Sequence, residues 1–182
     1  MYEVKNINAG LVLFENINGE YYSLLGSYFD KNDNKIYTFP GGGYLKNNNE
    51  TALHTAMREF IEEIFNIKVA ETKLNEIVKI IQVKNLLSNI YIYKPNKFIT
   101  YFGNFNILKI IYKNIYNHKL NLYNFIKFRN RKVNEKIIPK DGLNEFNKIH
   151  LIKINYLIKK KIKIRIISKY ILNKMIQLFN IN

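Results

Sequence analysis

A run of glycines followed by a glutamate-rich segment is the feature that most constrains how this chain can fold. Pro40 and three glycines come first, and Glu59, Glu62 and Glu63 follow. On an α-helix these glutamates are related as i, i+3 and i+4, so we expect their carboxylates to share one face. Three neighbouring carboxylates repel one another, and a hard cation such as Mg²⁺ or Mn²⁺ would relieve that repulsion. The segment therefore predicts a helix with a metal site.

The residues around these glutamates resemble the signature box of the Nudix hydrolases. Taken alone, three glutamates are more often a solvated helix face. Here residues 58–63 (REFIEE) match the box, with Phe60 at its aliphatic position, and Glu50 precedes Arg58 by eight residues. The chain departs from the box in the glycine-to-Glu50 spacing, which is one residue longer, and after the glutamate pair, where glycine is missing. Because Asn tolerates the left-handed conformation that ends helices, we expect the helix to stop at Asn66.

The resemblance implies a fold and a chemistry. The fold would be α/β, a sandwich in which a mixed central sheet lies between layers of helices. The activity would be metal-dependent hydrolysis of a diphosphate linked to another moiety, with Mg²⁺ or Mn²⁺ held by Glu59, Glu62 and Glu63. Glu50 and Arg58 would orient these ligands or a metal-bound water, although Arg58 could equally pair with Glu62 one turn on.

Gly41, Gly42 and Gly43 are the candidate phosphate-binding residues. A glycine run lets the backbone approach a ligand closely and direct its N–H groups at phosphate oxygens. An ordinary tight turn would explain the same run.

The base that activates water is expected downstream of Glu76, where three acids remain. Glu145 resembles the late glutamate of decapping-type members of the family and is the favoured candidate. Asp141 lies in a Lys-Asp-Gly turn, where Asp is common for conformational reasons. Glu135 lies among basic residues and could be a surface ion partner.

The bulk of the sequence predicts one intracellular domain. A length of 182 residues is enough for a single core. There is no cysteine, so no disulfide partner is expected, and no stretch of eighteen apolar residues predicts a membrane span. No signal peptide is recognisable. We expect a cytoplasmic protein, in the host cytoplasm if the source is a large DNA virus, as the decapping resemblance would allow.

The charge is unevenly distributed. The net charge is +15; residues 1–76 hold seven Lys and Arg against eleven Asp and Glu, and residues 77–182 hold twenty-two against three. A basic half suits a nucleotide or capped RNA substrate, but AT-rich codon usage would produce the same surface. Aromatic residues interleave with cations between positions 112 and 131, where they would either stack bases or pack onto the core: Tyr112, Tyr116, Tyr123, Phe125 and Phe128.

Hydrophobic patterning gives the expected elements. Strands are predicted at 9–14, 21–26, 36–39, 77–83, 90–93 and 98–105, with a late strand near 149–154. The glutamate helix should begin at the N-cap Thr51 and bury Leu53, Met57, Phe60 and Ile64. Residues 106–136 read as a basic, partly helical insertion, and 165–179 as a closing helix.

Three functions remain open at this stage. The first is a Nudix-type pyrophosphohydrolase acting on the 5′ cap of mRNA or on smaller substrates such as nucleotides or inositol pyrophosphates. The second is a non-catalytic module that binds RNA. The third, association of the basic C-terminal helix with a membrane surface, is less well explained than docking of that helix on the core. The sequence does not specify the substrate, the preferred metal or the oligomeric state.

Overall fold

The computed structural model describes residues 6–45, 50–132, 146–159 and 162–181. The predicted base Glu145 and its alternatives Glu135 and Asp141 lie outside these residues.

The described residues form one mixed sheet of seven strands. Its main path runs β3-β2-β1-β6-β5, while β4 pairs with β1 and β7 pairs with β2. The strands are β1 (Ala9–Ile17), β2 (Glu20–Phe29), β3 (Lys35–Thr38), β4 (Gly41–Gly42), β5 (Leu87–Tyr93), β6 (Phe98–Gly103) and β7 (Lys148–Lys153). Strands β1 and β6 are parallel, and the other pairs are antiparallel.

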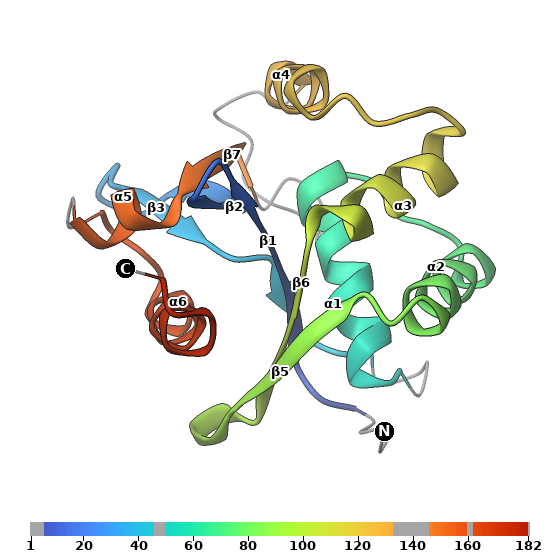
Figure 1. The fold of residues 1–182 in the computed structure, drawn as a ribbon, viewed down its shortest axis with the longest axis horizontal. Coiled ribbons are helices and arrows are strands. Elements are labelled where there is room, and N and C mark those ends of the chain that lie inside the picture. The colour runs from blue at the N-terminus through green and yellow to red at the C-terminus, as the bar shows by residue number, and fades with distance from the viewer. Residues whose placement is uncertain (1–5, 46–49, 133–145, 160–161, 182) are drawn as a thin grey trace.

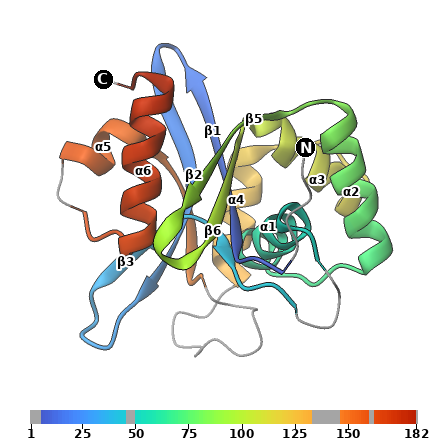
Figure 2. The ribbon, with the colours of Figure 1, turned by 90° about the horizontal axis from the view of Figure 1, so that it is seen from below.

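Helices cover both faces of this sheet (Figures 1 and 2). On one side lie α1 (Ala52–Phe60), continued by a π-helical turn (Ile61–Phe65), α2 (Glu71–Val83), α3 (Phe105–Tyr116) and α4 (Leu122–Lys132). On the other side lie α5 (Ile154–Lys159) and α6 (Ile166–Phe179). The expected α/β sandwich with a mixed central sheet is therefore confirmed. Within the part of the chain that is described, no helix is both long and apolar enough to span a bilayer.

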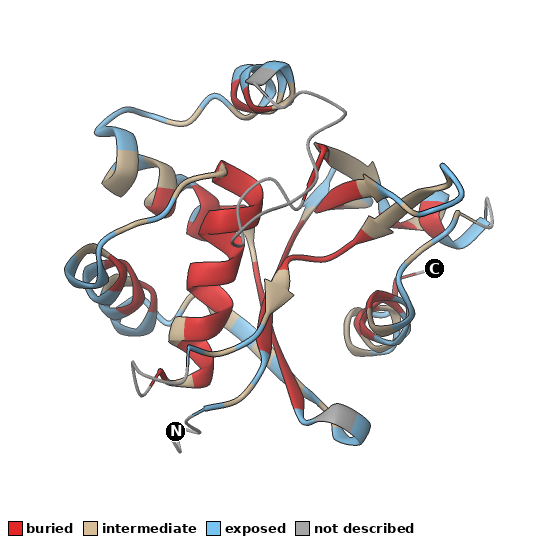
Figure 3. Cartoon of the chain, turned by 180° about the vertical axis from the view of Figure 1, so that it is seen from behind, coloured by how far each residue is buried: buried red, intermediate tan, exposed pale blue. Residues whose placement is uncertain are grey.

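Strand β1 shows why the core has two halves. Its side chains alternate between the faces of the sheet. Ala9, Leu11 and Leu13 belong to the core beneath α1, α2 and α3, whereas Val12 and Phe14 belong to the core beneath α5 and α6. Figure 3 shows this buried strand between the two helical layers. A central strand buried on both faces is a continuous apolar run, as the sequence predicted.

One predicted strand is wrong. Residues 77–83 form the C-terminal half of α2, in which Ile77, Val78 and Ile81 are buried and Lys79 and Gln82 are exposed. Burial at i, i+1 and i+4 is the helical period, but a short apolar run does not distinguish helix from strand by itself.

The predicted strand 98–105 is two residues too long. It ends at Gly103 because the side chain of Asn104 accepts a hydrogen bond from the N–H of Asn106 and caps α3. Helix α3 then buries Ile107, Leu108 and Ile111 in the main core.

Candidate active site: a buried carboxylate cluster

Helix α1 begins and packs as its sequence predicts. The hydroxyl of Thr51 accepts a hydrogen bond from the N–H of His54, which makes Thr51 the N-cap. The expected apolar stripe is buried along its length: Leu53, Met57, Phe60 and Ile64. This stripe fixes the rotation of the helix and brings its glutamates against the glycine strand β4.

Arg58 lies at the centre of the predicted glutamates. Its Nε donates to Glu50 Oε1 at 2.8 Å. Its Nη1 donates to Glu59 Oε1 at 2.7 Å and to Glu62 Oε2 at 3.1 Å. We call Glu50, Arg58, Glu59, Glu62 and Glu63 the carboxylate cluster. The structure brings together residues that are spread over fourteen positions of sequence, and one guanidinium bridges three of the four carboxylates.

Glu50 ties this cluster to the loop before the helix. Its Oε2 accepts hydrogen bonds from the N–H of Leu45 at 2.9 Å and from the hydroxyl of Thr55 at 3.2 Å. Arg58 Nη2 also donates to the carbonyl of Gly43 at 2.5 Å. Gly43 is therefore held by Arg58, and Leu45 is held by Glu50.

The glycines press directly on two of the carboxylates. The N–H of Gly41 donates to Glu63 Oε2 at 2.7 Å, so this amide is directed at the cluster. A Cβ on Gly42 would lie 2.3 Å from Glu59 Oε2, so a side chain there would displace the Glu59 carboxylate. Gly41 has a φ of +153°, a conformation that favours glycine, and lies against Gly10 of β1. Gly41 and Gly42 thus pack closely against the cluster and its neighbouring strand. We call Gly41, Gly42 and Gly43 the glycine wall.

Burial and pairing shift the pKa values of the cluster residues in different directions. Burial opposes ionisation of Glu50, but hydrogen bonds from Arg58 and from the N–H of Leu45 outweigh it and hold the pKa of Glu50 below its usual value. For Glu62 burial prevails over the attraction of Arg58 and raises the pKa. Burial also disfavours the charged form of Arg58, yet the carboxylates of Glu50 and Glu59 raise its pKa above normal. Arg58 therefore stays charged at any pH at which the protein is folded.

The carboxylate cluster is enclosed. A helix docked by its apolar stripe can leave its acids in solvent, but Glu50, Arg58, Glu59, Glu62 and Glu63 are each less than a tenth exposed. Gly41, Gly42, Gly43 and Leu45 contact the cluster on the side that an isolated helix would expose to solvent. Buried charges need partners of opposite sign. Arg58 is that partner for Glu50, Glu59 and Glu62.

A π-helical turn accommodates the departure from the expected box. Residues Ile61–Phe65 form this turn, and Asn66 follows with φ 58° and ψ 43°, the left-handed conformation predicted for the helix stop. A π-turn holds one more residue than an α-turn, so the additional residue before Asn66 is absorbed within the helix. Glu62 and Glu63 lie inside the widened turn, which changes their direction relative to Glu59.

Arg129 of α4 holds the C-terminal end of the glutamate helix. It lies in the segment in which we expected cations to meet RNA, yet it is 3% exposed. Its Nε donates to the carbonyl of Ile64 at 3.1 Å, and its Nη2 donates to the carbonyls of Glu63 and Phe146. A cation at the last carbonyls of a helix is favoured by the helix dipole. Burial lowers the pKa of Arg129 to about 10. The only sequence signal was that Arg129 is one of four arginines among twenty-nine basic residues.

The aromatic residues near Arg129 divide between the core and the surface. Tyr112, Tyr116 and Phe125 pack against the Phe65 ring of the π-turn, at centroid distances of 6.4, 6.3 and 4.8 Å. Tyr123 and Phe128 are exposed. Packing against Phe65 therefore explains Tyr112, Phe125 and one face of the half-exposed Tyr116.

A pocket of about 600 Å³ opens on the other side of the glycine wall. Gly41, Gly42 and Gly43 line it together with the start of α6 and the rings of Phe39, Tyr93 and Phe98. The hydroxyl of Ser168 accepts a hydrogen bond from the N–H of Phe39 and fixes α6 to this wall. We call this the glycine-side pocket.

The carboxylates suit a hard divalent cation by their chemistry. Four glutamates lie around one Arg58, which pairs with three of them, so carboxylates outnumber the guanidinium in a buried place. Oxygen donors of this kind are preferred by Mg²⁺ and Mn²⁺. As the side chains lie here, Glu50, Glu59 and Glu62 turn toward Arg58, and no group of three or more acidic or histidine residues in the described chain is arranged as a ready cation site.

Comparison with known proteins gives likeness at the level of shape. No protein-family model matches the sequence, and neither does any curated protein. Among solved structures, the chain is similar to a mutT/nudix family protein from Listeria innocua, with a TM-score of 0.44 and 12% identity over 98% of this chain and 94% of that one. It is also similar to a MutT/nudix family protein from Enterococcus faecalis, with a TM-score of 0.39 and 12% identity over 84% of this chain and 45% of that one. Function is therefore inferred from this chain's own side chains.

Proposed function

We propose that the protein is a Nudix-type pyrophosphohydrolase that cleaves a diphosphate linked to another moiety. The observation that carries the proposal is the assembly of Glu50, Arg58, Glu59, Glu62 and Glu63 directly behind the glycine wall. The carboxylates lie on one side of that wall and the glycine-side pocket lies on the other. A substrate with a diphosphate at the wall would place its other moiety against the aromatic rings of the pocket.

Each residue has a role in this proposal. Glu59, Glu62 and Glu63 hold Mg²⁺ or Mn²⁺, which when bound would supply a Lewis acid and a water of lowered pKa. Glu50 fixes Arg58 through two hydrogen bonds, and Arg58 holds the ligands in place. Gly42 and Gly43 offer backbone without side chains to the phosphates, since the N–H of Gly41 already serves Glu63. Glu145 is kept as the proposed base. Hydrolysis of the 5′ cap of mRNA is one candidate reaction; nucleotides and inositol pyrophosphates are others.

One observation favours a second candidate, a Nudix-like module that binds RNA without cleaving it. Arg58 already donates hydrogen bonds to three carboxylates, so these carboxylates are paired without a metal ion. A module of this kind would bind RNA in the presence of EDTA and show no turnover.

Product release from a substrate panel tests the proposal. Cap-labelled RNA, dNTPs, ADP-ribose, dinucleoside polyphosphates and an inositol pyrophosphate would be incubated with Mg²⁺ or Mn²⁺. We expect metal-dependent turnover that falls by about 100-fold or more in Glu62→Gln, because a cation ligand supplies several kcal/mol to the transition state. The matched control is Glu71→Gln, which removes the same charge from an exposed position on α2 and should retain full activity.

The outcome separates the two candidates. Turnover lost in Glu62→Gln and kept in Glu71→Gln supports the hydrolase and names its substrate class. Absence of turnover across the panel, with RNA bound equally with and without EDTA, would replace it with the binding module. Full activity in Glu62→Gln would remove the carboxylate cluster from the chemistry altogether.

A further inference from the structure

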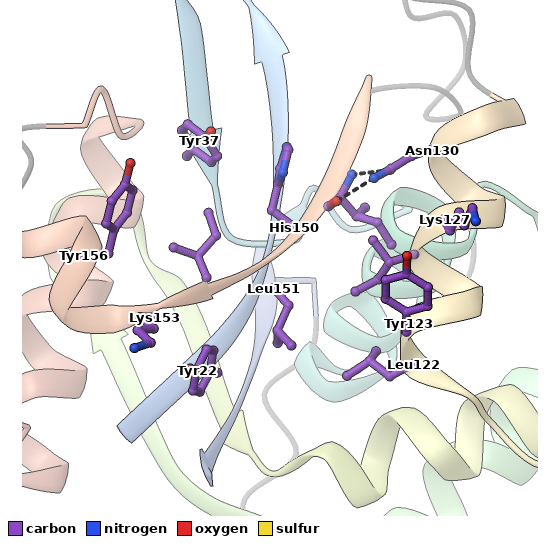
Figure 4. A pocket seen from close by; sticks show the side chains of 13 residues that line it. Tyr22, Tyr37, Leu122, Tyr123, Lys127, Asn130, His150, Leu151, Lys153 and Tyr156 are labelled. Atoms are coloured by element: carbon purple, nitrogen blue, oxygen red, sulfur yellow. Dashed lines mark hydrogen bonds between the residues drawn. The ribbon is translucent and has the colours of Figure 1, made fainter. Parts of the chain in front are cut away.

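An open groove of about 840 Å³ lies along β7, away from the carboxylate cluster. Its walls come from β2, β3, α4, β7 and α5, and four tyrosines line it: Tyr22, Tyr37, Tyr123 and Tyr156. Figure 4 shows Tyr37 and Tyr156 on one side of the β7 ribbon and Tyr22 and Tyr123 on the other. We call it the tyrosine groove. Its volume is in the range of pockets that accept small ligands, and its open form would let a longer chain pass through.

Lysine ammonium groups accompany the tyrosine rings. Three of the four rings have a lysine Nζ over them, at centroid distances of 5.0 Å for Lys35 on Tyr37, 5.9 Å for Lys127 on Tyr123 and 5.9 Å for Lys153 on Tyr22. A ligand that stacks on one of these rings would therefore meet a positive charge beside it. Flat aromatic groups joined by phosphates are the ligands that fit such alternation.

The described residues of the groove carry lysines and no acid. None of its described lining residues has a carboxylate, and the nearby Glu20 is already paired with Lys153 at 2.6 Å. Lys127 and Lys35 have no such carboxylate partner among the described residues. Burial, together with the charges of Lys35 and Lys148, lowers the pKa of His150 in the groove to about 4. The groove therefore attracts anions at neutral pH.

The outer edge of β7 is closed to a pairing strand near its first residues. Among the described residues β7 pairs with β2 alone. On its other edge, the side-chain amide of Asn130 donates to the carbonyl of Ile149 at 2.9 Å, and the N–H of Ile149 donates to Asn130 Oδ1 at 2.8 Å. This amide takes the place that the backbone of an added strand would need. Recognition in the groove must therefore use rings and ammonium groups, which disfavours an extended peptide.

We propose that the tyrosine groove binds single-stranded nucleic acid, with bases stacked on tyrosine rings and phosphates at Lys127 and Lys35. Tyr123 is 72% exposed, so its ring is accessible to a base. Stacking on aromatic side chains tolerates any base, because every base has a π-face. The site goes beyond the proposed hydrolase and does not depend on it.

Fluorescence anisotropy with labelled oligouridine and oligo-dT of about ten nucleotides tests the site, since single-strand sites span roughly 4–16 nucleotides. We expect Tyr123→Ala to weaken binding about fivefold or more, and Tyr123→Phe, which keeps the ring, to stay within about twofold of wild type. Both variants should fold, because Tyr123 is largely exposed; circular dichroism checks this.

The lysine is tested by salt dependence. Lys127→Ala should lower the slope of log Kd against log salt by about 0.7, the value for one phosphate contact with a single strand. Lys79→Ala removes the same charge from the exposed face of α2 and should leave the slope unchanged. The strand should bind as tightly with EDTA as with Mg²⁺ or Mn²⁺, so failure of the hydrolase and failure of this site are distinguishable.

Several results would overturn the inference. Strand binding that is equal in wild type and Tyr123→Ala would place the strand elsewhere, and no binding at low salt would remove it. Displacement of the strand by inorganic polyphosphate, at equal phosphate concentration, would show that the rings contribute nothing. Tyr123-dependent binding of an acidic peptide but not of either oligonucleotide would assign the groove to a protein partner. Binding of RNA, of DNA or of both supports it and identifies the source.

Discussion

The carboxylate cluster and the tyrosine groove differ in how their charges are treated. In the cluster, four carboxylates and Arg58 are each less than a tenth exposed, and hydrogen bonds of 2.7–3.2 Å join the arginine to three of them. In the groove, Tyr123 and Tyr156 are exposed, and Lys127 lies 5.9 Å from a ring centroid. The first site is closed and its charges are hydrogen-bonded to one another, whereas the second is open to solvent.

This difference predicts how each site is coupled to folding. An unpaired charge left in a buried place destabilises a protein by several kcal/mol, whereas surface substitutions usually change stability by less than about 0.5 kcal/mol. Variants of the cluster should therefore lose stability and activity together. Variants of the groove should lose binding alone.

The largest effect is expected from Arg58→Met. It removes the only cation hydrogen-bonded to Glu50, Glu59 and Glu62 in the described structure, so the free energy of unfolding should fall by about 3–5 kcal/mol in urea denaturation. Mg²⁺ or Mn²⁺ should restore part of this loss by replacing the missing charge. Arg131→Met, on the exposed side of α4, is the control and should stay within about 0.5 kcal/mol. A loss below about 1 kcal/mol for Arg58→Met would erase the contrast between the two sites.

Arg129→Met should have an intermediate effect. It leaves the carbonyls of Glu63, Ile64 and Phe146 without a buried donor, which predicts a loss of about 2 kcal/mol in the free energy of unfolding. If Arg129 also positions the cluster, the Mn²⁺ concentration for half-maximal activity should rise, and Arg129→Lys should fall between wild type and Arg129→Met. Lost stability with an unchanged Mn²⁺ requirement would make Arg129 purely structural.

The last effect, similar in size to that of Arg129→Met, concerns the histidine that lines the groove. His150 donates to or accepts from the Ser27 hydroxyl at 2.9 Å, and its pKa is lowered to about 4, against about 6.5 in an unfolded chain. Between those values the unfolded state binds the extra proton, so stability is complete above pH 6.5 and falls as the pH drops toward 4. Because His150 is partly exposed, the loss should be about 2 kcal/mol. In His150→Gln, measured by urea denaturation across the same range, this portion of the pH dependence should vanish; its persistence would assign it to another group.

Features set by local residues could be predicted from the sequence. The stripe of α1, its cap at Thr51 and its stop at Asn66 follow from periodicity and from the conformations these residue types prefer. The hairpin between β1 and β2 follows from Asn18-Gly19, both of which have positive φ. Each of these signals lies within a few residues of the structure it specifies.

Features set by distant contacts could not. The acids of α1 are buried because the glycine wall and Leu45 cover them, and nothing near Glu59 in sequence indicates that cover. The role of Arg129 depends on carbonyls more than sixty residues earlier. The tyrosine groove joins β2, β3, α4, β7 and α5, so its rings look unrelated along the chain. In α2, the apolar run at 77–83 fitted both the helical period and the strand period. Packing of its buried residues on the core selects the helix.

The parallel pairing of β1 with β6 sets an order for assembly during synthesis. Ala9 is opposite Ile99, so the strand behind the glycine wall cannot complete its edge until residue 99 has left the ribosome. The acids of α1 emerge about forty residues earlier, and the guanidinium that holds the end of their helix emerges thirty residues later still. The charged helix of the nascent chain must therefore stay hydrated until the sheet that encloses it has formed. Enclosure of the carboxylates is a late step that depends on the C-terminal half of the chain.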